Sequence, residues 1–203
     1  MNFVAEGGTT IFVPGGGITY TRNTNGPDLS FGVQYAAYAM GSTAFKPHGA
    51  PATEWEIVEA NLHTTTATAD LLWRIPLDEK EIVELRLGAG IGVGIAFAGD
   101  IYRWQAFPPS GREDNPSLWE KCRGPNDPAG TFRYCNQLDK DANRYGKADP
   151  YWHEGGLRPL FFPWLSIPQV GLTFHTSETT ALDVEVGATL NGLMTSLGMR
   201  FGL

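Results

Sequence analysis

The sequence predicts an all-β protein of 203 residues, an eight-stranded antiparallel transmembrane β-barrel with one long extracellular loop. Two observations support this fold class. Apolar residues alternate with small or polar residues over segments longer than the roughly five or six residues of an ordinary strand. No run approaches the roughly 18 consecutive apolar residues of a transmembrane helix. A closed barrel is the other structure that satisfies its own backbone hydrogen bonds in lipid.

The segment 82–98 is the most informative one. Large apolar residues occupy one parity of this segment: Val83, Leu85, Leu87, Ala89, Ile91, Val93, Ile95 and Phe97. The other parity includes four alternating glycines, from Gly88 to Gly94. A period of two places the two sets on opposite faces of one strand. Because glycines form a poor water-facing surface but leave room inside a narrow barrel, we expect the apolar face to contact lipid.

Seven further segments alternate in a similar way. We predict strands, in chain order, at 2–13, 18–20, 29–41, 64–75, 164–174, 182–190 and 193–203. Asn191-Gly192 joins the last two strands and is a two-residue hairpin signal. Pro168 is expected to mark a bulge or an irregular edge, because proline donates no hydrogen bond to a sheet. Together with 82–98, these segments give eight strands.

The connections between the predicted strands fall into two groups. On one side they are the short turns 23–28, 76–81 and 176–179. On the other side they are 14–17, 42–54, 99–163 and 191–192. Short turns on one side and the longest loop on the other are typical of bacterial outer-membrane barrels. We therefore expect residues 1–203 to form a single outer-membrane domain with both termini in the periplasm and with residues 99–163 as an extracellular loop between the fifth and sixth strands.

The predicted barrel resembles a known family. Its alternating-glycine strand, its strand count and its last strand, ending Gly198-Met199-Arg200-Phe201-Gly202-Leu203, are similar to the OmpA-like small outer-membrane barrels. The resemblance covers residues 2–98 and 164–203 and leaves 99–163 without a counterpart. It implies an eight-stranded barrel in the outer membrane and carries no catalytic signature.

Ionisable residues gather on the inward parity near one end of the predicted barrel: Asp70, Arg74, Glu84, Arg86, Asp183, Glu185 and Arg200. The lumen of an eight-stranded barrel is only about one side chain wide. Four acids and three bases in such a space must pair, because unpaired charge away from water is costly. We interpret the set as an ion-pair plug in the periplasmic half of the lumen. The alternative interpretation is a gated narrow pore.

The long loop is rich in aromatic residues. Four of them are candidates for recognising a partner: Trp104, Trp119, Tyr134 and Trp152. Disordered segments are poor in aromatic residues, so we expect a folded cap in which several of these side chains are buried among themselves. Loops on rigid scaffolds carry recognition, which makes the cap the expected binding surface.

Two further features of the loop concern its cysteines and its exit. Cys122 and Cys135 are expected to form a disulfide, because exported proteins fold in an oxidising compartment. Phe161, Phe162 and Trp164 are typical of an aromatic girdle at the membrane surface.

The leading function prediction is a non-enzymatic outer-membrane protein with a structural or surface-recognition role. Its partners would be membrane lipid, including lipopolysaccharide, and a protein or glycan at the loop. A narrow channel for small solutes is the second prediction. A lipid-modifying enzyme is the third, because His175, Ser177 and Glu178 resemble the His/Ser/Glu arrangement of lipid A deacylase barrels.

Composition excludes other classes of function. A net charge of −7 without a basic patch argues against a nucleic-acid partner. The four histidines and two cysteines show no metal-ligand spacing, so neither a metal nor another cofactor is expected.

Overall fold

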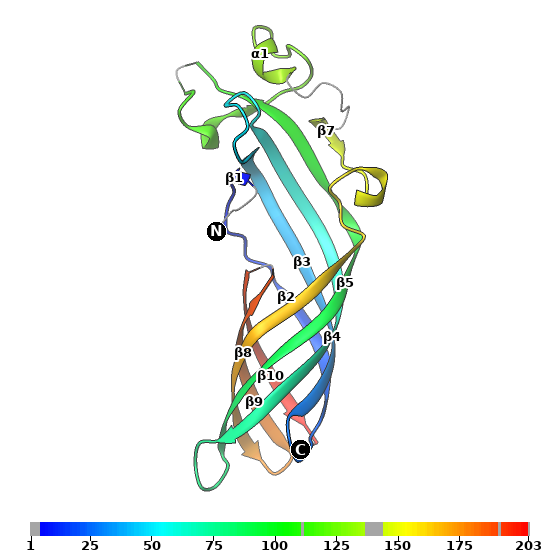
Figure 1. Ribbon diagram of the computed structural model, residues 1–203, viewed down its shortest axis with the longest axis vertical. Coiled ribbons are helices and arrows are strands. Elements are labelled where there is room, and N and C mark those ends of the chain that lie inside the picture. The colour runs from blue at the N-terminus through cyan, green and yellow to red at the C-terminus, as the bar shows by residue number, and fades with distance from the viewer. Residues whose placement is uncertain (1–4, 111, 137–143, 191, 203) are drawn as a thin grey trace. The chain divides into compact units, whose positions relative to one another are not determined.

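The computed structural model describes residues 5–110, 112–136, 144–190 and 192–202 (Figure 1). Its strands are β1 (Ala5–Gly7), β2 (Gly15–Arg22), β3 (Asp28–Pro47), β4 (Glu56–Pro76), β5 (Val83–Phe107), β6 (Glu120–Lys121), β7 (Tyr145–Ala148), β8 (Phe161–Ser177), β9 (Thr180–Thr189) and β10 (Gly192–Phe201). Its helices are short: η1 (Pro116–Leu118), α1 (Phe132–Cys135) and η3 (Trp152–Glu154). The prediction of an all-β antiparallel protein is confirmed.

The ten strands form one sheet, in which neighbours follow the order β1-β3-β4-β5-β8-β9-β10. β2 also pairs with β3, and β6 and β7 pair with β5. Within the described ranges, no pairing leads from β10 back to the first strands. The sheet therefore has ten strands rather than the expected eight, and its pairings do not close it.

The chain divides into two compact units. Unit 1 consists of Met1–Pro14, Ala36–Thr64 and Ala96–Leu160. Unit 2 consists of Gly15–Tyr35, Thr65–Ile95 and Phe161–Leu203. Each of the long strands β3, β4 and β5 contributes one part to each unit.

Unit 2 contains the strands that the alternating pattern predicts best. β5 pairs with β8 from Val83 opposite Phe174 to Ile95 opposite Phe161. β9 pairs with β10 along its whole length, and Asn191 of the predicted turn between them lies outside the described residues. The register between β8 and β9 shifts between Ser166 and Gln169, so the irregularity expected at Pro168 is present.

The first predicted strand, 2–13, is shorter in the part of the chain that the structure describes. β1 has three residues and pairs with β3, with Ala5 opposite Pro47. The expected turn at 14–17 is absent, because Gly15–Gly17 begin β2. β2 joins β3 through the short turn 23–27, so β1 and β2 are both antiparallel to β3 and run in the same direction.

Unit 1 shows that the predicted loop 99–163 begins as a strand. β5 continues through Gly99 to Phe107, beyond the predicted end at residue 98. Gly99 has φ +84, and a Cβ there would lie 1.5 Å from the carbonyl oxygen of Asn61. Only glycine fits this position, so the residue that looked like a strand end allows β4 and β5 to stay in contact. β6 and β7 then cover part of the edge of β5.

Candidate functional site

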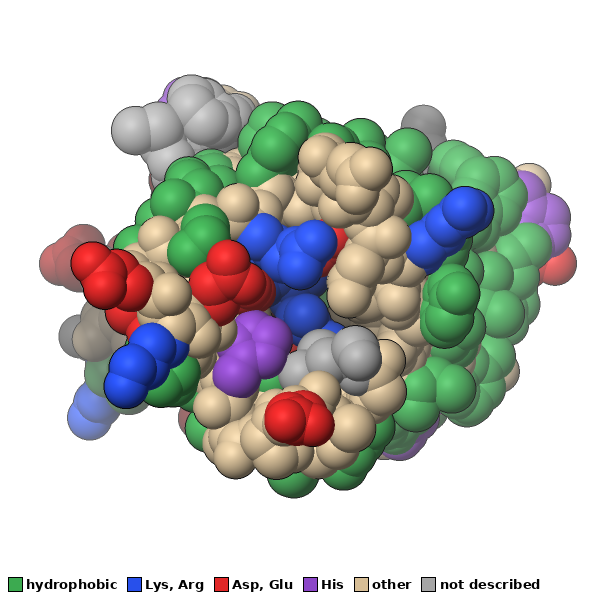
Figure 2. All heavy atoms as spheres, turned by 90° about the horizontal axis from the view of Figure 1, so that it is seen from below, with side chains coloured by type: hydrophobic (Ala, Val, Ile, Leu, Met, Phe, Trp, Pro, Cys, Tyr) green, Lys and Arg blue, Asp and Glu red, His purple; other side chains and the backbone are tan. Residues whose placement is uncertain are grey.

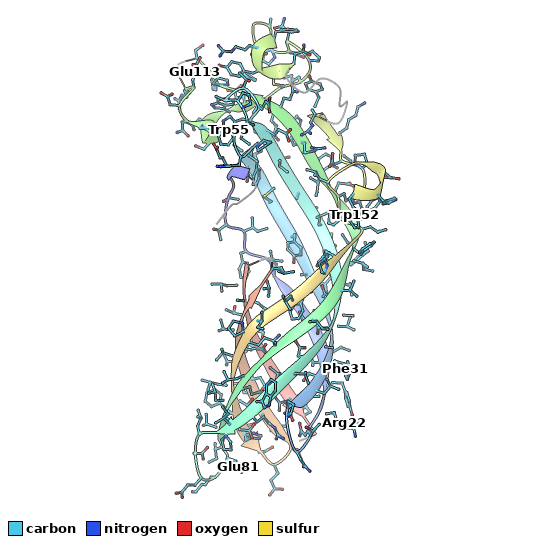
Figure 3. All side chains as sticks on the ribbon, viewed as in Figure 1. Arg22, Phe31, Trp55, Glu81, Glu113 and Trp152 are labelled. Carbon is cyan, nitrogen blue, oxygen red and sulfur yellow. A yellow bond between two sulfur atoms is a disulfide. The ribbon has the colours of Figure 1, made fainter. Side chains whose placement is uncertain are left out.

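Unit 2 buries polar side chains and exposes apolar ones. Its buried polar residues include Asp28, Ser30, Thr66, Thr68, Asp70, Glu84, Arg86, Ser166, Gln169 and Thr173. Its exposed apolar residues include Ile18, Tyr20, Phe31, Val33, Leu71, Trp73, Leu87, Ile91, Val93, Val184, Val186, Leu197 and Phe201. Figure 3 shows Phe31 on the outer side of its strand. This distribution is the reverse of a water-soluble core.

Asp183 is the centre of a charged cluster in this interior. Arg200 donates to both of its carboxylate oxygens, at 3.0 and 3.1 Å. Arg86 lies 3.8 Å from the same carboxylate, and Thr173 donates to it at 2.5 Å. The expected ion pairs of Arg86 and Arg200 are therefore present. Glu185 shares the parity of Asp183 on β9 and is half-buried.

One further ion pair and one carboxylate–imidazole contact use partners that the sequence did not indicate. Arg74 pairs at 2.9 Å with Asp28, whose side chain is 0% exposed. Glu84 lies 3.4 Å from the imidazole of His175. The sequence places Asp28 in a predicted turn and His175 beside one, whereas in the structure both lie near the ends of strands and their side chains reach the interior. The interior thus holds more charge than alternation alone predicted.

Asp70 departs from the expectation of an ion pair. Its carboxylate accepts a hydrogen bond from the side-chain amide of Gln169 at 2.8 Å. Gln169 is buried and follows the irregularity at Pro168, which directs its side chain inward. Asp70 is also tightly covered, since a Cβ at Gly90 would lie 1.9 Å from its carboxylate oxygen. The alternating glycines therefore do make room for opposing side chains, as predicted.

Aromatic side chains fill another part of the interior. The ring of Phe162 lies 2.2 Å from where a Cβ at Gly94 would stand. Trp164, two residues along β8, is only 9% exposed. The prediction that both residues belong to an aromatic girdle is therefore wrong, whereas Phe161 has the opposite parity and is exposed. Alternation could not predict which side chains point inward here, because both parities of residues 161–164 carry large apolar residues.

The charged interior opens at the end where the hairpin turns lie. Figure 2 views this end and shows basic, acidic and histidine side chains gathered in a hollow, with hydrophobic side chains outside it. A hollow of about 470 Å³ is lined there by residues that include Arg74, Glu84, His175 and Arg200. Ser177 shares a hydrogen bond of 2.7 Å with Thr180. The structure therefore does not bring its hydroxyl to His175 in the relay that the deacylase resemblance would require.

Unit 1 has an apolar core of the ordinary kind. Trp119, 7% exposed, packs with Ile57 and Ala106, and with Trp55, Trp104 and Tyr134 around them. Its ring makes edge contacts with Trp55 at 6.2 Å and Tyr134 at 5.6 Å between centroids. Of the four predicted recognition aromatics, three therefore form a cluster. Trp152 does not join them and is 49% exposed (Figure 3).

The predicted disulfide between Cys122 and Cys135 is present. Both cysteines are fully buried beside Phe107, with Tyr134 and Tyr145 against them. The bridge links the segment after β6 to α1, so it holds the cap to the end of β5.

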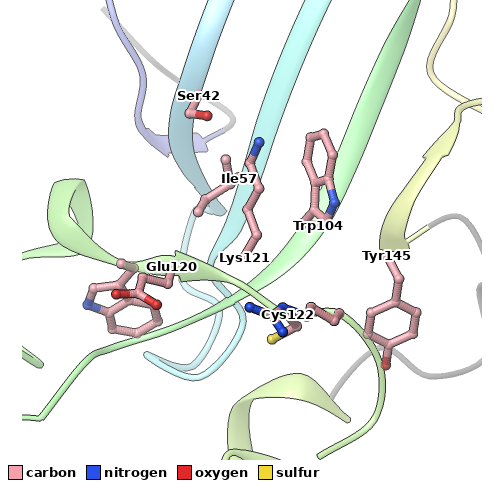
Figure 4. Close-up of a pocket in the computed structure, with 9 residues that line it drawn as sticks. Ser42, Ile57, Trp104, Glu120, Lys121, Cys122 and Tyr145 are labelled. Atoms are coloured by element: carbon pink, nitrogen blue, oxygen red, sulfur yellow. The ribbon is translucent and has the colours of Figure 1, made fainter. Parts of the chain in front are cut away.

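A hollow of about 570 Å³ with a mixed polar and apolar lining lies beside this core (Figure 4). Lys121 projects into it, with its ammonium 3.8 Å from the centre of the Trp104 ring and 2.5 Å from Glu59. The hydrogen bond from Lys121, together with one from Ser42, lowers the pKa of Glu59 below its usual range. The hollow therefore combines aromatic and charged groups at neutral pH.

A buried charge network supports the other face of the same strands. Arg103 donates to Asp149 at 3.0 Å from Nε and at 2.5 Å from a terminal nitrogen. Glu56 lies 4.0 Å from Arg103 and accepts a hydrogen bond from Arg144. Burial raises the pKa of Glu56, and the two arginines oppose that effect. The network joins β4 and β5 to the residues on either side of β7 in unit 1.

Comparisons with known proteins do not add an assignment. Neither protein-family models, nor curated proteins, nor solved structures gave a match to this chain. In the described part of the chain, no helix has the length and apolar character needed to cross a membrane. The same residues contain no group of three His, Cys, Asp or Glu side chains placed to hold a metal ion.

Proposed function

We propose that this chain is a bacterial outer-membrane protein in which unit 2 crosses the lipid bilayer and unit 1 is a folded recognition module at the cell surface. One observation supports this most strongly: unit 2 has a polar interior and an apolar exterior, whereas unit 1 has an apolar core. The same chain thus folds one unit for contact with lipid and the other for contact with water.

The strands of unit 2 have suitable lengths for this role. β9 and β10 have 10 residues each, and a tilted membrane strand needs about nine to eleven. We propose that unit 2 closes into an eight-stranded barrel in lipid, in keeping with the OmpA-like resemblance of its strands. Closure would satisfy the backbone groups at the two edges of the sheet, which a hydrocarbon environment cannot do.

The contents of the interior favour a plugged barrel over a channel. Ion pairs join Arg86 and Arg200 to Asp183, and the Phe162 ring rests on Gly94. A barrel of eight strands has space only for such side chains. A narrow channel remains the second candidate, on the strength of the hollow at the turn end.

Recognition is assigned to unit 1 because its surface is held rigidly. Its aromatic core, the Cys122–Cys135 bridge and the Arg103–Asp149 pair each limit movement of the connections. A rigid surface loses little conformational entropy on binding. The hollow beside Trp104 and Lys121 offers aromatic and charged groups of the kind that bind a protein or glycan.

Expression in a bacterium that has an outer membrane tests the proposal. We expect the protein in the outer-membrane fraction, with faster migration on gels when the sample is not boiled. We expect no conductance steps in planar bilayers. A soluble protein with unchanged migration would contradict the membrane assignment, and regular conductance steps would replace the plug with a channel.

A further inference from the structure

Two strands form the edges of the sheet in unit 2. β2 pairs with β3, β10 pairs with β9, and within the described residues neither strand has a second neighbour. Nearly every residue of both strands is exposed, and Leu193 at the start of β10 is 85% exposed. These edges therefore present rows of backbone donors and acceptors. Hydrocarbon cannot satisfy those groups, so in a membrane both edges need a partner.

The direction of the two edges restricts what can cover them. Five strands, β3, β4, β5, β8 and β9, lie between β2 and β10. Successive strands are joined as hairpins or paired antiparallel, so six reversals bring β10 back to the direction of β2. A strand that pairs with both edges in the antiparallel sense must run in the opposite direction.

A second copy of the chain does not meet this requirement. Copies in one membrane share an orientation, so their β2 and β10 edges all run in one direction. Contacts between copies would therefore be parallel pairs, whereas bacterial outer-membrane barrels consist of antiparallel strands.

The residues that precede β2 can run in the required direction, opposite to β2 and β10. If the chain turns at Pro14–Gly17, residues 5–13 run antiparallel to β2. They are nine residues long, which is enough for a tilted membrane strand, and they carry no charge from Gly7 to Val13. A side chain at Gly16 would meet nothing within 4 Å, so the turn has room to form.

These residues make a short pairing in the structure. β1 pairs over three residues with β3, and two backbone bonds follow, from Gly8 to Ala44 at 3.1 Å and from Ala37 to Pro14 at 3.0 Å. Residues 7–10 are exposed, and Phe12 is 86% exposed. On β10, a side chain at Gly198 would meet nothing within 4 Å, which leaves space for a large neighbour.

We propose that residues 5–13 leave β3 when unit 2 enters lipid and insert between β2 and β10 as the eighth strand. The inference rests on the proposed membrane location and names the segment that completes the barrel. Burial of Phe12 and satisfaction of both edges favour the inserted arrangement in lipid, and pairing with β3 is favoured in water.

Engineered disulfides in the full chain distinguish the two pairings. Glu6 and Lys46 face each other in the register of β1 and β3, so Glu6→Cys with Lys46→Cys bridges only the arrangement in the structure. Ile11→Cys, combined in turn with Thr19→Cys, Tyr20→Cys or Thr21→Cys, reports the hairpin with β2. Thr195→Cys with Val186→Cys is the matched control, because it bridges β9 and β10 without restraining residues 5–13.

In phospholipid vesicles we expect one Ile11 pair to bridge at least tenfold more than the Glu6–Lys46 pair. Oxidising the Glu6–Lys46 pair before insertion should abolish the fast-migrating band, reductant should restore it, and the control bridge should leave it unchanged. Inserted protein in which the Glu6–Lys46 bridge predominates would overturn the inference and leave the membrane assignment intact. Failure of the unsubstituted protein to insert would overturn both.

Discussion

At the scale of single residues, Ile91 offers a direct test of the proposed lipid-facing surface. Its side chain is 64% exposed in the middle of the alternating-glycine part of β5. An arginine at the midplane of a barrel's lipid face costs about 2–4 kcal/mol, so Ile91→Arg should greatly reduce the protein recovered as a heat-modifiable band in vesicles. Ile91→Leu is the matched control. Equal insertion of both variants would show that this face does not contact lipid.

Asp183 tests the ion-pair plug. Replacing it with alanine removes the partner of Arg200 and of Arg86 while both guanidinium groups stay in the interior. Breaking a buried pair in this way should lower the free energy of unfolding by about 3 kcal/mol, measured by urea unfolding in vesicles. Asp183→Asn keeps one acceptor oxygen for Arg200 and Thr173 and should cost less. Glu178→Ala, at an exposed turn, should have little effect, and an equal loss there would argue against the plug.

The charged interior also shows how far parity predicts a side chain's direction. Arg86 and Asp183 lie inside regular strands, Arg200 lies one residue before the end of β10, and alternation placed all three correctly. Asp28 and His175 lie next to turns, where composition suggested loops, so the sequence gave no reason to count them as interior. The Gln169–Asp70 bond depends on a register shift that reverses parity after Pro168. Such shifts are set by pairing between strands and are not visible in one segment.

At the scale of elements, the turn between β4 and β5 is held by one carboxylate. Asp78 accepts hydrogen bonds from the backbone N–H of Val83 at 2.7 Å and of Lys80 at 3.2 Å. The bond from Val83 is the main reason that the pKa of Asp78 lies below its ordinary value of 3.8. Because the folded-state pKa is lowered, the stabilisation is present above the ordinary value and is lost as the pH falls through the folded-state pKa.

We therefore expect the amide of Val83 to lose protection against hydrogen exchange below about pH 4, after correction for the intrinsic rate. Asp78→Asn retains an acceptor but does not titrate, so its protection should change little over the same range. Glu79→Gln, in the same turn, should behave like the unsubstituted protein. A loss of protection that is the same in Asp78→Asn would show that another group controls the turn.

The lengths of the strands were harder to predict than their existence. In most of unit 2 one face of a strand is polar or small and the other apolar, and this contrast marks the strands in the sequence except at the start of β8. In unit 1 both faces of β5 are covered, by the Arg103–Asp149 pair on one side and by the Trp119 cluster on the other. Alternation is lost where both faces are buried, so β5 seemed to end near Gly99. The aromatic content of the following segment still predicted a folded cap, and the expected export to an oxidising compartment predicted its disulfide.

At the scale of the whole molecule, the two units follow opposite rules of burial, which the proposed membrane location would explain. The cores of unit 1, with Ile57, Trp119 and Phe107, need water outside them. The exposed aliphatic and aromatic side chains of unit 2 need an apolar medium, since exposed apolar surface of this kind associates in water. This contrast in burial within one chain is the basis for proposing that unit 2 lies in a membrane and unit 1 in water.

Protease treatment of intact cells tests this division. The connection between β5 and β8 should be reachable from outside, whereas the turn at 77–82 should be cut only after the outer membrane is permeabilised. The Cys122–Cys135 bridge closes a separation of 13 residues, which corresponds to about 3 kcal/mol on the chain-entropy model. Reductant should therefore accelerate cleavage of unit 1 and leave the strands of unit 2 protected.

Rapid cleavage throughout residues 99–163 of the oxidised protein would show that this segment is a tether and would remove the basis for a recognition module. Cleavage at 77–82 in intact cells would instead show that this turn faces outside. The proposed orientation of unit 2 would then be reversed, because its two ends face opposite sides of the bilayer.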